Sequence, residues 1–306
     1  MQAFYCDLFV LPLPPGHRFP MEKYRLLREA ALASGALSPE DLAVPEAATR
    51  EEILRVHDAG YVERVERGEL TPAEVRRIGF PWSRAMVERC LRSAGGTLAA
   101  CRAALQTGLA VNLAGGTHHA FRDRGEGYCV WNDAAIAARA MQAEGRAGRV
   151  LIVDCDVHQG NGTAAIFAAD PTVYTLSLHG RHNFPFHKEK SDLDIELEDG
   201  TGDAAYLAAL EEGLSRALPA AAADLAIYVA GADPHAGDRL GRLSLSTAGL
   251  AERDRRVFER LRRAGLPTAA VMAGGYGREV ADTVAVHLGT VTAARRSWEA
   301  WQEGVS

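Results

Sequence analysis

Short apolar runs alternate with helical patterns through the second two-thirds of the chain. The apolar runs that predict strands lie at 109–120, 150–158, 172–180, 224–235 and 267–277. Helical spacing of apolar residues marks the segments 132–145, 163–169, 203–218, 247–264 and 278–295. This alternation predicts a parallel sheet with helices on both faces and right-handed crossovers. We therefore expect residues 1–306 to form one three-layer αβα domain with a mostly parallel sheet.

The first hundred residues carry a less regular pattern. We expect a strand at 4–11, followed by a stiff proline-rich loop, and helices at 21–34, 50–65 and 81–105. The longest stretch without a clear pattern lies at 180–200, and we expect it to be a loop over the ligand site.

Unusual polar residues follow the apolar runs at the carboxyl end of each predicted strand. They are His118 and His119, then Asp154, Asp156 and His158, then Ser177 and His179, then Asp233, and finally Tyr276. In open parallel sheets the ligand site lies outside the carboxyl ends of the strands. We therefore expect these side chains to meet in one place.

The segment 150–163 carries the strongest chemical signal. Asp154, Asp156 and His158 alternate with apolar residues, so a side-chain period of two places all three on one side of the chain. Buried carboxylates need compensation. Asp156, His158 and Asp233 would form a three-ligand zinc site with one open position for water, whose pKa zinc lowers toward about 7. The alternative interpretation is a structural Asp–His network without metal.

The tandem histidines and the glycine-flanked tyrosine suggest further catalytic groups. One of His118 and His119 is expected to act as a general base, while Asp154 is a natural partner for the other. The Tyr276 hydroxyl is placed to donate to an oxyanion, although a tyrosine beside a turn often only packs. His57 is more often a packing residue than a ligand.

Composition narrows the class of protein. The formal net charge is −6, which argues against nucleic acid or an anionic membrane as a partner. The five cysteines form no CxxC motif, and no apolar run approaches the roughly 18 residues of a membrane span. We found no signal peptide and expect a cytoplasmic protein.

An ordered set of motifs resembles the zinc-dependent histone deacetylase family of the arginase/deacetylase superfamily. The motifs are GGTHHA (115–120), DRGEGYCVWND (123–133), IVDCDVHQGNGT (152–163), YTLSLH (174–179), AGADPHAGDRLGRLSLS (230–246) and AGGYG (273–277). The resemblance covers roughly residues 50–290. Its details are most similar to the class IV branch and to bacterial histone-deacetylase-like or acetoin-utilisation proteins.

The resemblance implies an arginase/deacetylase fold and specific roles for these residues. It implies one zinc ion per chain at Asp156, His158 and Asp233, His119 as the general base and acid beside His118, and Tyr276 as the carbonyl-polarising hydroxyl. It also implies a structural potassium ion. The ligands of that ion would be Asp154, Asp156, His158, Ser177 and Leu178.

The resemblance further assigns the substrate channel. Gly127 and Tyr128 would face Phe184 across the channel, with Leu240 at the rim and Gly275 beside Tyr276. The alternative interpretation of these aromatic residues is that they only cover the hydrophobic core, as aromatic residues in loops often do. Arg18 is a candidate for an arginine that lines an internal cavity in this family. Asn161 stands where class I enzymes carry an Asp, which favours a neutral His119.

These observations predict a metal-dependent hydrolase of N-acyl amides. The substrate is expected to be an acylated lysine of a protein or peptide, or an acylated small amine such as an acylpolyamine. More distant alternatives are a two-manganese ureohydrolase, which would need further carboxylates near Asn161 and His235, and a non-catalytic acyl-lysine binder. The acidic residues at 188–199 could attract cationic substrates electrostatically. The alternative is that they belong to an ordinary solvated loop. The oligomeric state stays open.

Overall fold

Eight parallel strands form one sheet in the computed structural model, which describes residues 1–304. The order across the sheet is β2-β1-β3-β8-β7-β4-β5-β6, and every neighbouring pair is parallel. The strands are β1 (Gln2–Phe4), β2 (Leu42–Ala43), β3 (Leu109–Asn112), β4 (Val150–Asp154), β5 (Val173–Gly180), β6 (Leu193–Leu197), β7 (Leu225–Ala230) and β8 (Thr268–Met272).

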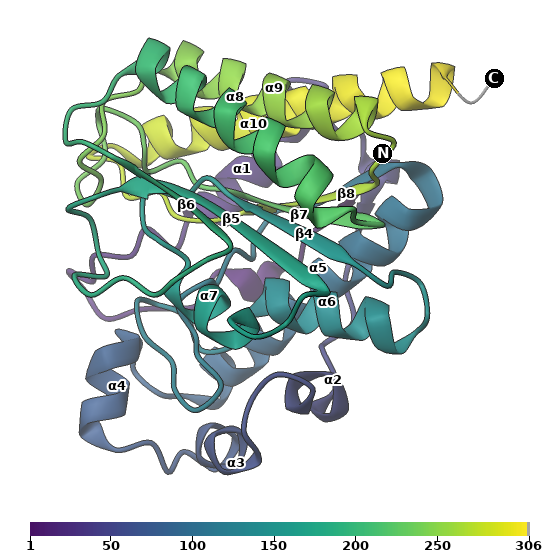
Figure 1. Ribbon diagram of the computed structural model, residues 1–306. Coiled ribbons are helices and arrows are strands. Elements are labelled where there is room, and N and C mark those ends of the chain that lie inside the picture. Colours follow the sequence, from purple (N-terminus) through teal and green to yellow (C-terminus); the bar gives the residue numbers. More distant parts are fainter. Residues whose placement is uncertain (305–306) are drawn as a thin grey trace.

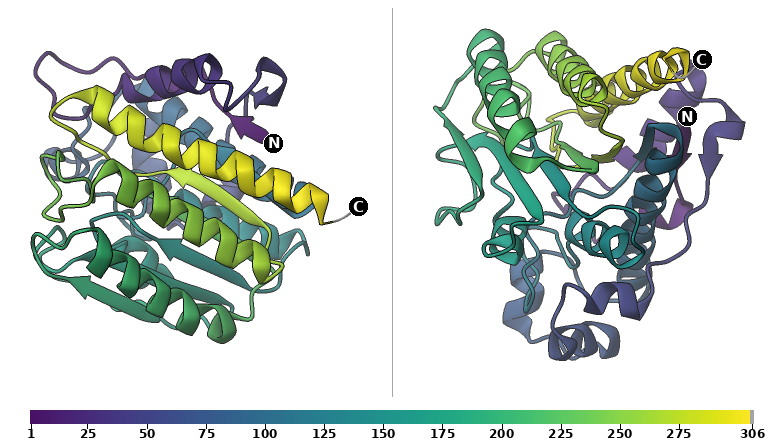
Figure 2. Two further views of the ribbon diagram at one scale, coloured as in Figure 1. Left: turned by 90° about the horizontal axis from the view of Figure 1, so that it is seen from above. Right: turned by 45° about the vertical axis from the view of Figure 1, so that its right-hand side comes forward.

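Helices cover both faces of this sheet. One face carries α1 (Lys23–Ala33), α8 (Asp203–Ala221), α9 (Thr247–Arg263) and α10 (Val280–Glu303), and the last three lie side by side in Figure 2. The other face carries α5 (Arg84–Thr107), α6 (Asp133–Ala143) and α7 (Asn161–Phe167) (Figure 1). Beyond that layer lie α2 (Arg50–Leu54), α3 (Ala59–Arg67) and α4 (Pro72–Ile78). The expected three-layer αβα domain is confirmed.

The central strands are apolar because both of their faces are covered. Every residue of β3, β4, β7 and β8 is buried. Parallel sheets that lie between two helix layers favour such uninterrupted apolar runs. On α5, a Cβ at Gly96 would lie 2.7 Å from the Asn112 side chain, so glycine allows this helix to approach β3 closely.

The structure corrects several expected element boundaries. The predicted strand at 4–11 ends at Phe4, and a short 3₁₀ helix (Asp7–Phe9) follows it. The predicted helix at 50–65 is two helices, because the chain turns at 55–58 and buries His57. A further 3₁₀ helix (Pro39–Asp41) and α4 were not expected.

The segment 180–200 is not a loop throughout. Residues 193–197, with the sequence LDIEL, form the edge strand β6 and pair with β5. Their apolar and acidic residues alternate, which is the pattern of an edge strand and would have predicted it. The part that precedes β6 is irregular and contributes to the cavity described below. Within residues 1–304, no helix combines the length and the apolar character that crossing a membrane requires.

Candidate metal centre and catalytic site

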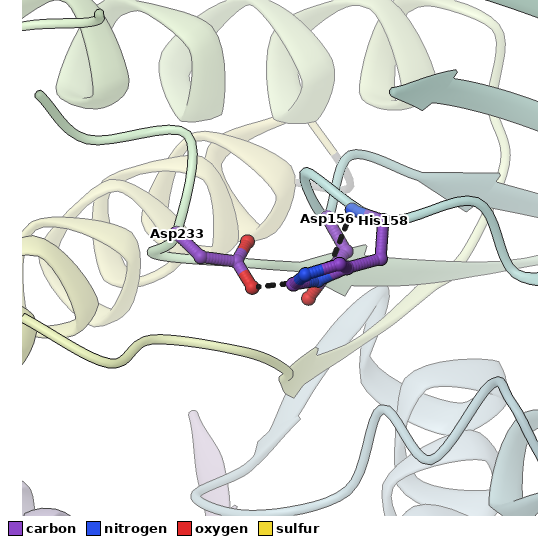
Figure 3. Close-up of side chains that lie close together, drawn as sticks. All are labelled: Asp156, His158 and Asp233. Atoms are coloured by element: carbon purple, nitrogen blue, oxygen red, sulfur yellow. Dashed lines mark hydrogen bonds and ion pairs between the residues drawn. The ribbon is translucent and has the colours of Figure 1, made fainter. Parts of the chain in front are cut away.

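Two carboxylates and one imidazole converge at the carboxyl ends of two neighbouring strands. Asp156 and His158 follow β4, and Asp233 follows β7, which pairs with β4. One ligand atom of each residue lies within 4.8 Å of the others, and all three side chains are buried. The His158 Nδ1 atom lies 2.8 Å from Asp156 Oδ1 and 3.3 Å from Asp233 Oδ2 (Figure 3).

Backbone groups fix these carboxylates but leave one oxygen without a hydrogen bond. The Val157 N–H donates to Asp233 Oδ1 at 2.9 Å, and the Gly274 N–H donates to Asp156 Oδ2 at 2.8 Å. The buried Asp233 Oδ2 accepts no hydrogen bond. A Cβ at position 274 would lie 1.9 Å from this oxygen, so glycine keeps the space beside it open.

The electrostatics of the cluster favour a positive charge between the carboxylates. Burial, together with the charge of Asp156, raises the pKa of Asp233 to about 7. Burial opposes protonation of His158, yet Asp156 and Asp233 raise its pKa to about 10. Oxygen and imidazole ligands, with one buried carboxylate oxygen that accepts no hydrogen bond, fit a divalent cation such as zinc. Among residues 1–304, this is the one group of three or more potential ligands close enough to hold a metal ion.

The tandem histidines have different partners and therefore different charges. His118 Nδ1 lies 2.6 Å from Asp154 Oδ2, and His119 Nδ1 lies 2.7 Å from Asn161 Oδ1. Burial opposes a charge on His118, but Asp154 and Asp156 raise its pKa to about 9. Burial and the nearby charged histidines hold the pKa of His119 well below its usual value. His119 is thus a neutral imidazole beside a charged one.

A carboxylate outside the predicted set orients His119. The Asn161 Nδ2 group donates to Glu126 Oε1 at 2.6 Å. An ionised carboxylate only accepts, so the amide nitrogen must face Glu126 and the amide oxygen must face His119. This oxygen accepts from His119 Nδ1–H, which leaves the lone pair on Nε2. Glu126 lies inside the DRGEGYCVWND motif, but no local pattern there assigns it a role.

Tyr276 is anchored through its backbone, and its hydroxyl is left without a partner. The Tyr276 N–H donates to Asp238 Oδ2 at 2.6 Å, while Asp238 Oδ1 accepts from the backbone of Leu240 and Gly241. Within residues 1–304, no group forms a hydrogen bond with the Tyr276 hydroxyl. Burial raises the pKa of Tyr276 well above its usual value, so the hydroxyl stays protonated and can donate. Asp238 was also not singled out from the sequence.

A cavity of about 520 Å³ connects His119, His158 and Tyr276 with the surface. His119, His158 and Tyr276 line it together with the predicted channel residues Gly127, Tyr128, Phe184 and Leu240. The His119 and Phe184 ring centroids are 5.0 Å apart. A Cβ at Gly127 would lie 2.6 Å from the His119 ring, so the absence of a side chain keeps the channel open there. The predicted channel residue Gly275 is not part of the lining of this cavity, and a Cβ there would meet Thr283 and Ala232 instead.

Three predicted potassium ligands outside the metal cluster, Asp154, Ser177 and Leu178, lie on the neighbouring strands β4 and β5. Ser177 and Leu178 are buried residues of β5, and Ser177 pairs with Asp154 across the sheet. The Ser177 hydroxyl forms a hydrogen bond of 2.9 Å with His179 Nδ1.

The expectation that Arg18 lines an internal cavity is wrong. Arg18 is exposed and lines a surface cavity of about 160 Å³ that also contacts Tyr276. Two buried cations lie behind the site instead. Arg89 lines a small internal cavity of about 30 Å³ together with Asp156, His158 and Tyr276. Lys23 is the second, and its Nζ donates to the Ala273 carbonyl at 3.1 Å. Burial lowers the pKa of Lys23 to about 8, although nearby carboxylates oppose this effect. The proline-rich sequence around Arg18 predicted a loop but not which side chain turns inward.

His57 supports the tandem-histidine loop from a buried position. Its Nδ1–H donates to the Phe121 carbonyl at 2.8 Å, and its Nε2 accepts from the Asn132 N–H at 3.0 Å. The Asn132 side chain in turn donates to the Ala120 carbonyl at 3.2 Å. The packing interpretation of His57 agrees with these contacts. A proton on Nε2 would break the bond with Asn132, and burial lowers the pKa of His57 to about 4.

This lowered pKa predicts an acid-dependent loss of stability. Between pH 6.5 and about pH 4 the unfolded state binds a proton at His57 that the folded state does not bind. The free energy of unfolding should therefore fall with falling pH in this window, by roughly 3 kcal/mol in total from this residue. A His57→Gln variant keeps a donor and an acceptor but cannot titrate. Urea unfolding at several pH values should give a shallower slope for the variant, and equal slopes would contradict the assignment.

Comparisons with known proteins give consistent matches. Residues 17–291 match the family described as histone deacetylase domain. An uncharacterised protein of Picosynechococcus sp. is 47% identical over 287 residues, covering 94% of this chain and 96% of that protein. The acetoin utilization protein AcuC of Bacillus subtilis is 32% identical, covering 85% of this chain and 73% of AcuC. The crystal structure of an HDAC homolog from Aquifex aeolicus superposes with a TM-score of 0.81 at 22% identity, covering 96% of this chain and 83% of that one, and so shares the fold.

Proposed function

This chain belongs to the histone deacetylase family, and from that premise we propose that it is a zinc-dependent deacylase of N-acyl-lysine or a related N-acyl amine. The family supports a deacetylase-type hydrolase in general. The observation that carries the proposal is that His158, one of the three clustered ligands, lines the same cavity as His119 and Tyr276.

Asp156, His158 and Asp233 would hold the zinc ion. When bound there, zinc would supply Lewis acidity that polarises an amide carbonyl and promotes the ionisation of water. The three ligands leave the cavity side of the cluster free, where His119, His158 and Tyr276 share one lining. A substrate carbonyl bound there would share the cavity with His119 and Tyr276, the two proposed catalytic groups.

His119 would move the proton. Because Asn161 occupies its Nδ1–H, its Nε2 lone pair is available to take a proton from the attacking water. The same nitrogen then protonates the leaving amine. His118 lies 2.6 Å from Asp154, and this carboxylate favours the charged form of His118. The low pKa of His119 suits a base that must be neutral at pH 7.

Tyr276 would stabilise the negative charge that develops on the carbonyl oxygen. Its hydroxyl is protonated and has no partner within residues 1–304, so it can donate to that oxygen. The bond between the Tyr276 N–H and Asp238 holds the segment in place. Glu126 would be a positioning residue, since it orients Asn161, which in turn orients His119.

A structural potassium ion at Asp154, Asp156, His158, Ser177 and Leu178 is part of the proposal. Two of these residues are also metal ligands in the zinc assignment, so the cation would act through the backbone that presents them. Its support is the pairing of Ser177 with Asp154 across the sheet.

A substrate panel tests the proposed function. Chelated protein reloaded with zinc should hydrolyse at least one of acetyl-, crotonyl-, octanoyl- or myristoyl-lysine peptides. The chelated protein should not do so, because no residue replaces the Lewis acid. N-acetylpolyamines, and arginine with two manganese ions, test the alternatives. Hydrolysis of arginine would favour a ureohydrolase, and binding of every acyl-lysine without turnover would favour a non-catalytic binder.

A further inference from the structure

Five exposed arginines surround the entrance of the main cavity. Arg76, Arg77 and Arg242 line the cavity itself, and Arg18 and Arg239 line the smaller cavity beside it. Both cavities include Leu240 and Tyr276 in their linings, so the five side chains belong to one entrance. We refer to these five residues as the arginine rim. The whole chain carries a net charge of −6, so the arginine rim is a positive region on an acidic protein.

The charge of the arginine rim is poorly compensated. Several exposed arginines elsewhere pair with a carboxylate on the same helix. Within residues 1–304, Arg18, Arg76, Arg77 and Arg239 form no ion pair. Arg242 alone has a carboxylate partner, and that pair lies on the exposed surface, where such pairs are weak.

Nearby acidic residues are held by other partners. Among the described residues, Glu126 is the one carboxylate that lines either cavity. It accepts a hydrogen bond from the Asn161 side chain. Most of the acidic run at 192–199 is held by groups outside the entrance: Asp192 binds Thr175, Asp194 binds Gln159, and Glu196 and Glu198 pair with Arg181. Asp199 alone reaches the arginine rim, where it pairs with Arg242, and no residue of the run lines either cavity. The run therefore does not give the entrance an acidic lining.

Arg239 is fixed in position by bonds that leave its charge free. Its Nε–H donates to the Tyr276 carbonyl at 3.0 Å, and a terminal N–H donates to the Arg18 carbonyl at 3.4 Å. A guanidinium has five N–H donors, so three remain for a ligand. A planar, pre-oriented guanidinium suits a carboxylate, which it can bind through two parallel bonds.

Helix electrostatics explain only part of the arginine rim. Arg76 and Arg77 lie in the last turn of α4, where basic residues interact favourably with the helix dipole. Arg18 and Arg239 lie in two other segments, far apart in the sequence, and no helix end accounts for them. Their meeting beside Tyr276 points to a ligand rather than to local stability.

We propose that the arginine rim binds a carboxylate on the amine side of the substrate, so that preferred substrates are acylated amines with an acidic group just outside the cavity. This inference rests on the proposed deacylase function. The acyl amide would reach His119 and Tyr276, while the amine portion passes the entrance and places its acidic group among the arginines. A protonated polyamine arm would meet the same arginines and be disfavoured by like-charge repulsion.

Matched substrates test this selectivity in the zinc-loaded enzyme. Three acetyl-lysine peptides of equal length carry Asp and Glu, Asn and Gln, or Lys and Arg beside the acetyl-lysine. We expect kcat/KM for the acidic peptide to exceed that for the neutral one about ten-fold at low salt, because several weak charge contacts act together. The advantage should shrink at about 0.5 M salt through screening. The small pair N-acetyl-6-aminohexanoate and its carboxamide shows whether a lone carboxylate is enough.

Variants of the arginine rim should change the preference itself. The double variant R76E/R77E and the single variant R239E should lower the acidic-to-neutral ratio of kcat/KM about ten-fold and raise the basic-to-neutral ratio. Arg50→Glu, on α2 and outside the linings of both cavities, is the matched control and should leave both ratios unchanged. A fluorescent acidic peptide without an acyl group gives a second readout, since its binding to the metal-free protein should weaken in the same variants.

The two proposals fail in different ways. If no acylated substrate is hydrolysed, the deacylase function is wrong. If all three peptides are hydrolysed with equal kcat/KM, or if reversed charge leaves the ratios unchanged, the deacylase function stands and the role of the arginine rim is wrong. Preference for the basic peptide or for N-acetylpolyamines in the unaltered enzyme would overturn the inference directly.

Discussion

An Asp233→Ala variant is expected to lose its metal ion and to fall below detectable deacylation. Asp233 supplies one of the three ligands and the buried Oδ2 atom that has no hydrogen bond. Without it only Asp156 and His158 remain, and two protein ligands hold zinc poorly. Lewis-acid stabilisation of the transition state amounts to several kcal/mol, so activity should fall at least about 10³-fold. Elemental analysis and turnover of the same sample measure both effects.

A second variant separates metal loss from misfolding. Asp233 Oδ1 also accepts the Val157 N–H, so removal of the side chain disturbs the backbone. Asp233→Asn keeps an acceptor there while it removes the charge, and it should likewise be poor in metal. Glu63→Ala is the control, because Glu63 forms only an exposed pair with Arg67. Full metal occupancy in both Asp233 variants would break the ligand assignment.

A Tyr276→Phe variant is expected to keep its metal ion and to lose most of its turnover. The hydroxyl forms no hydrogen bond within residues 1–304, so its removal should leave the fold and the metal cluster intact. Loss of one preorganised oxyanion donor typically lowers kcat about 10²–10³-fold. KM should change little, since the donor acts mainly in the transition state.

A conservative change at another tyrosine provides the control. Tyr174 lies on β5 and packs against the core, so Tyr174→Phe should leave kcat unchanged. If Tyr276→Phe retains full turnover, Tyr276 has no part in the reaction. If it loses both metal and activity, its role is structural instead.

The sequence was most informative where one pattern dominated the local environment. The buried strands β4 and β7 are uninterrupted apolar runs, so their place in a parallel sheet was predictable. The alternation of Asp154, Asp156 and His158 placed chemistry at the end of such a strand. Asp233 lies more than seventy residues later, yet sheet topology alone brought it to the same edge.

Features that depend on tertiary contacts were not predictable in this way. Glu126 accepts a hydrogen bond from Asn161, and Asp238 accepts hydrogen bonds from the backbone of Tyr276, Leu240 and Gly241. No local sequence pattern predicts such contacts. Arg18 and Lys23 are five residues apart in a proline-rich region, and only packing decides that Lys23 is the buried one. The arginine rim joins three distant segments, so no window of sequence contains it.

Anomalous diffraction from crystals of the zinc-loaded protein tests the central claim most directly. Data collected on both sides of the zinc absorption edge should show one peak per chain, between Asp156, His158 and Asp233. Two neighbouring peaks, or a single peak bound by other residues, would contradict the one-metal centre from which the proposed reaction starts.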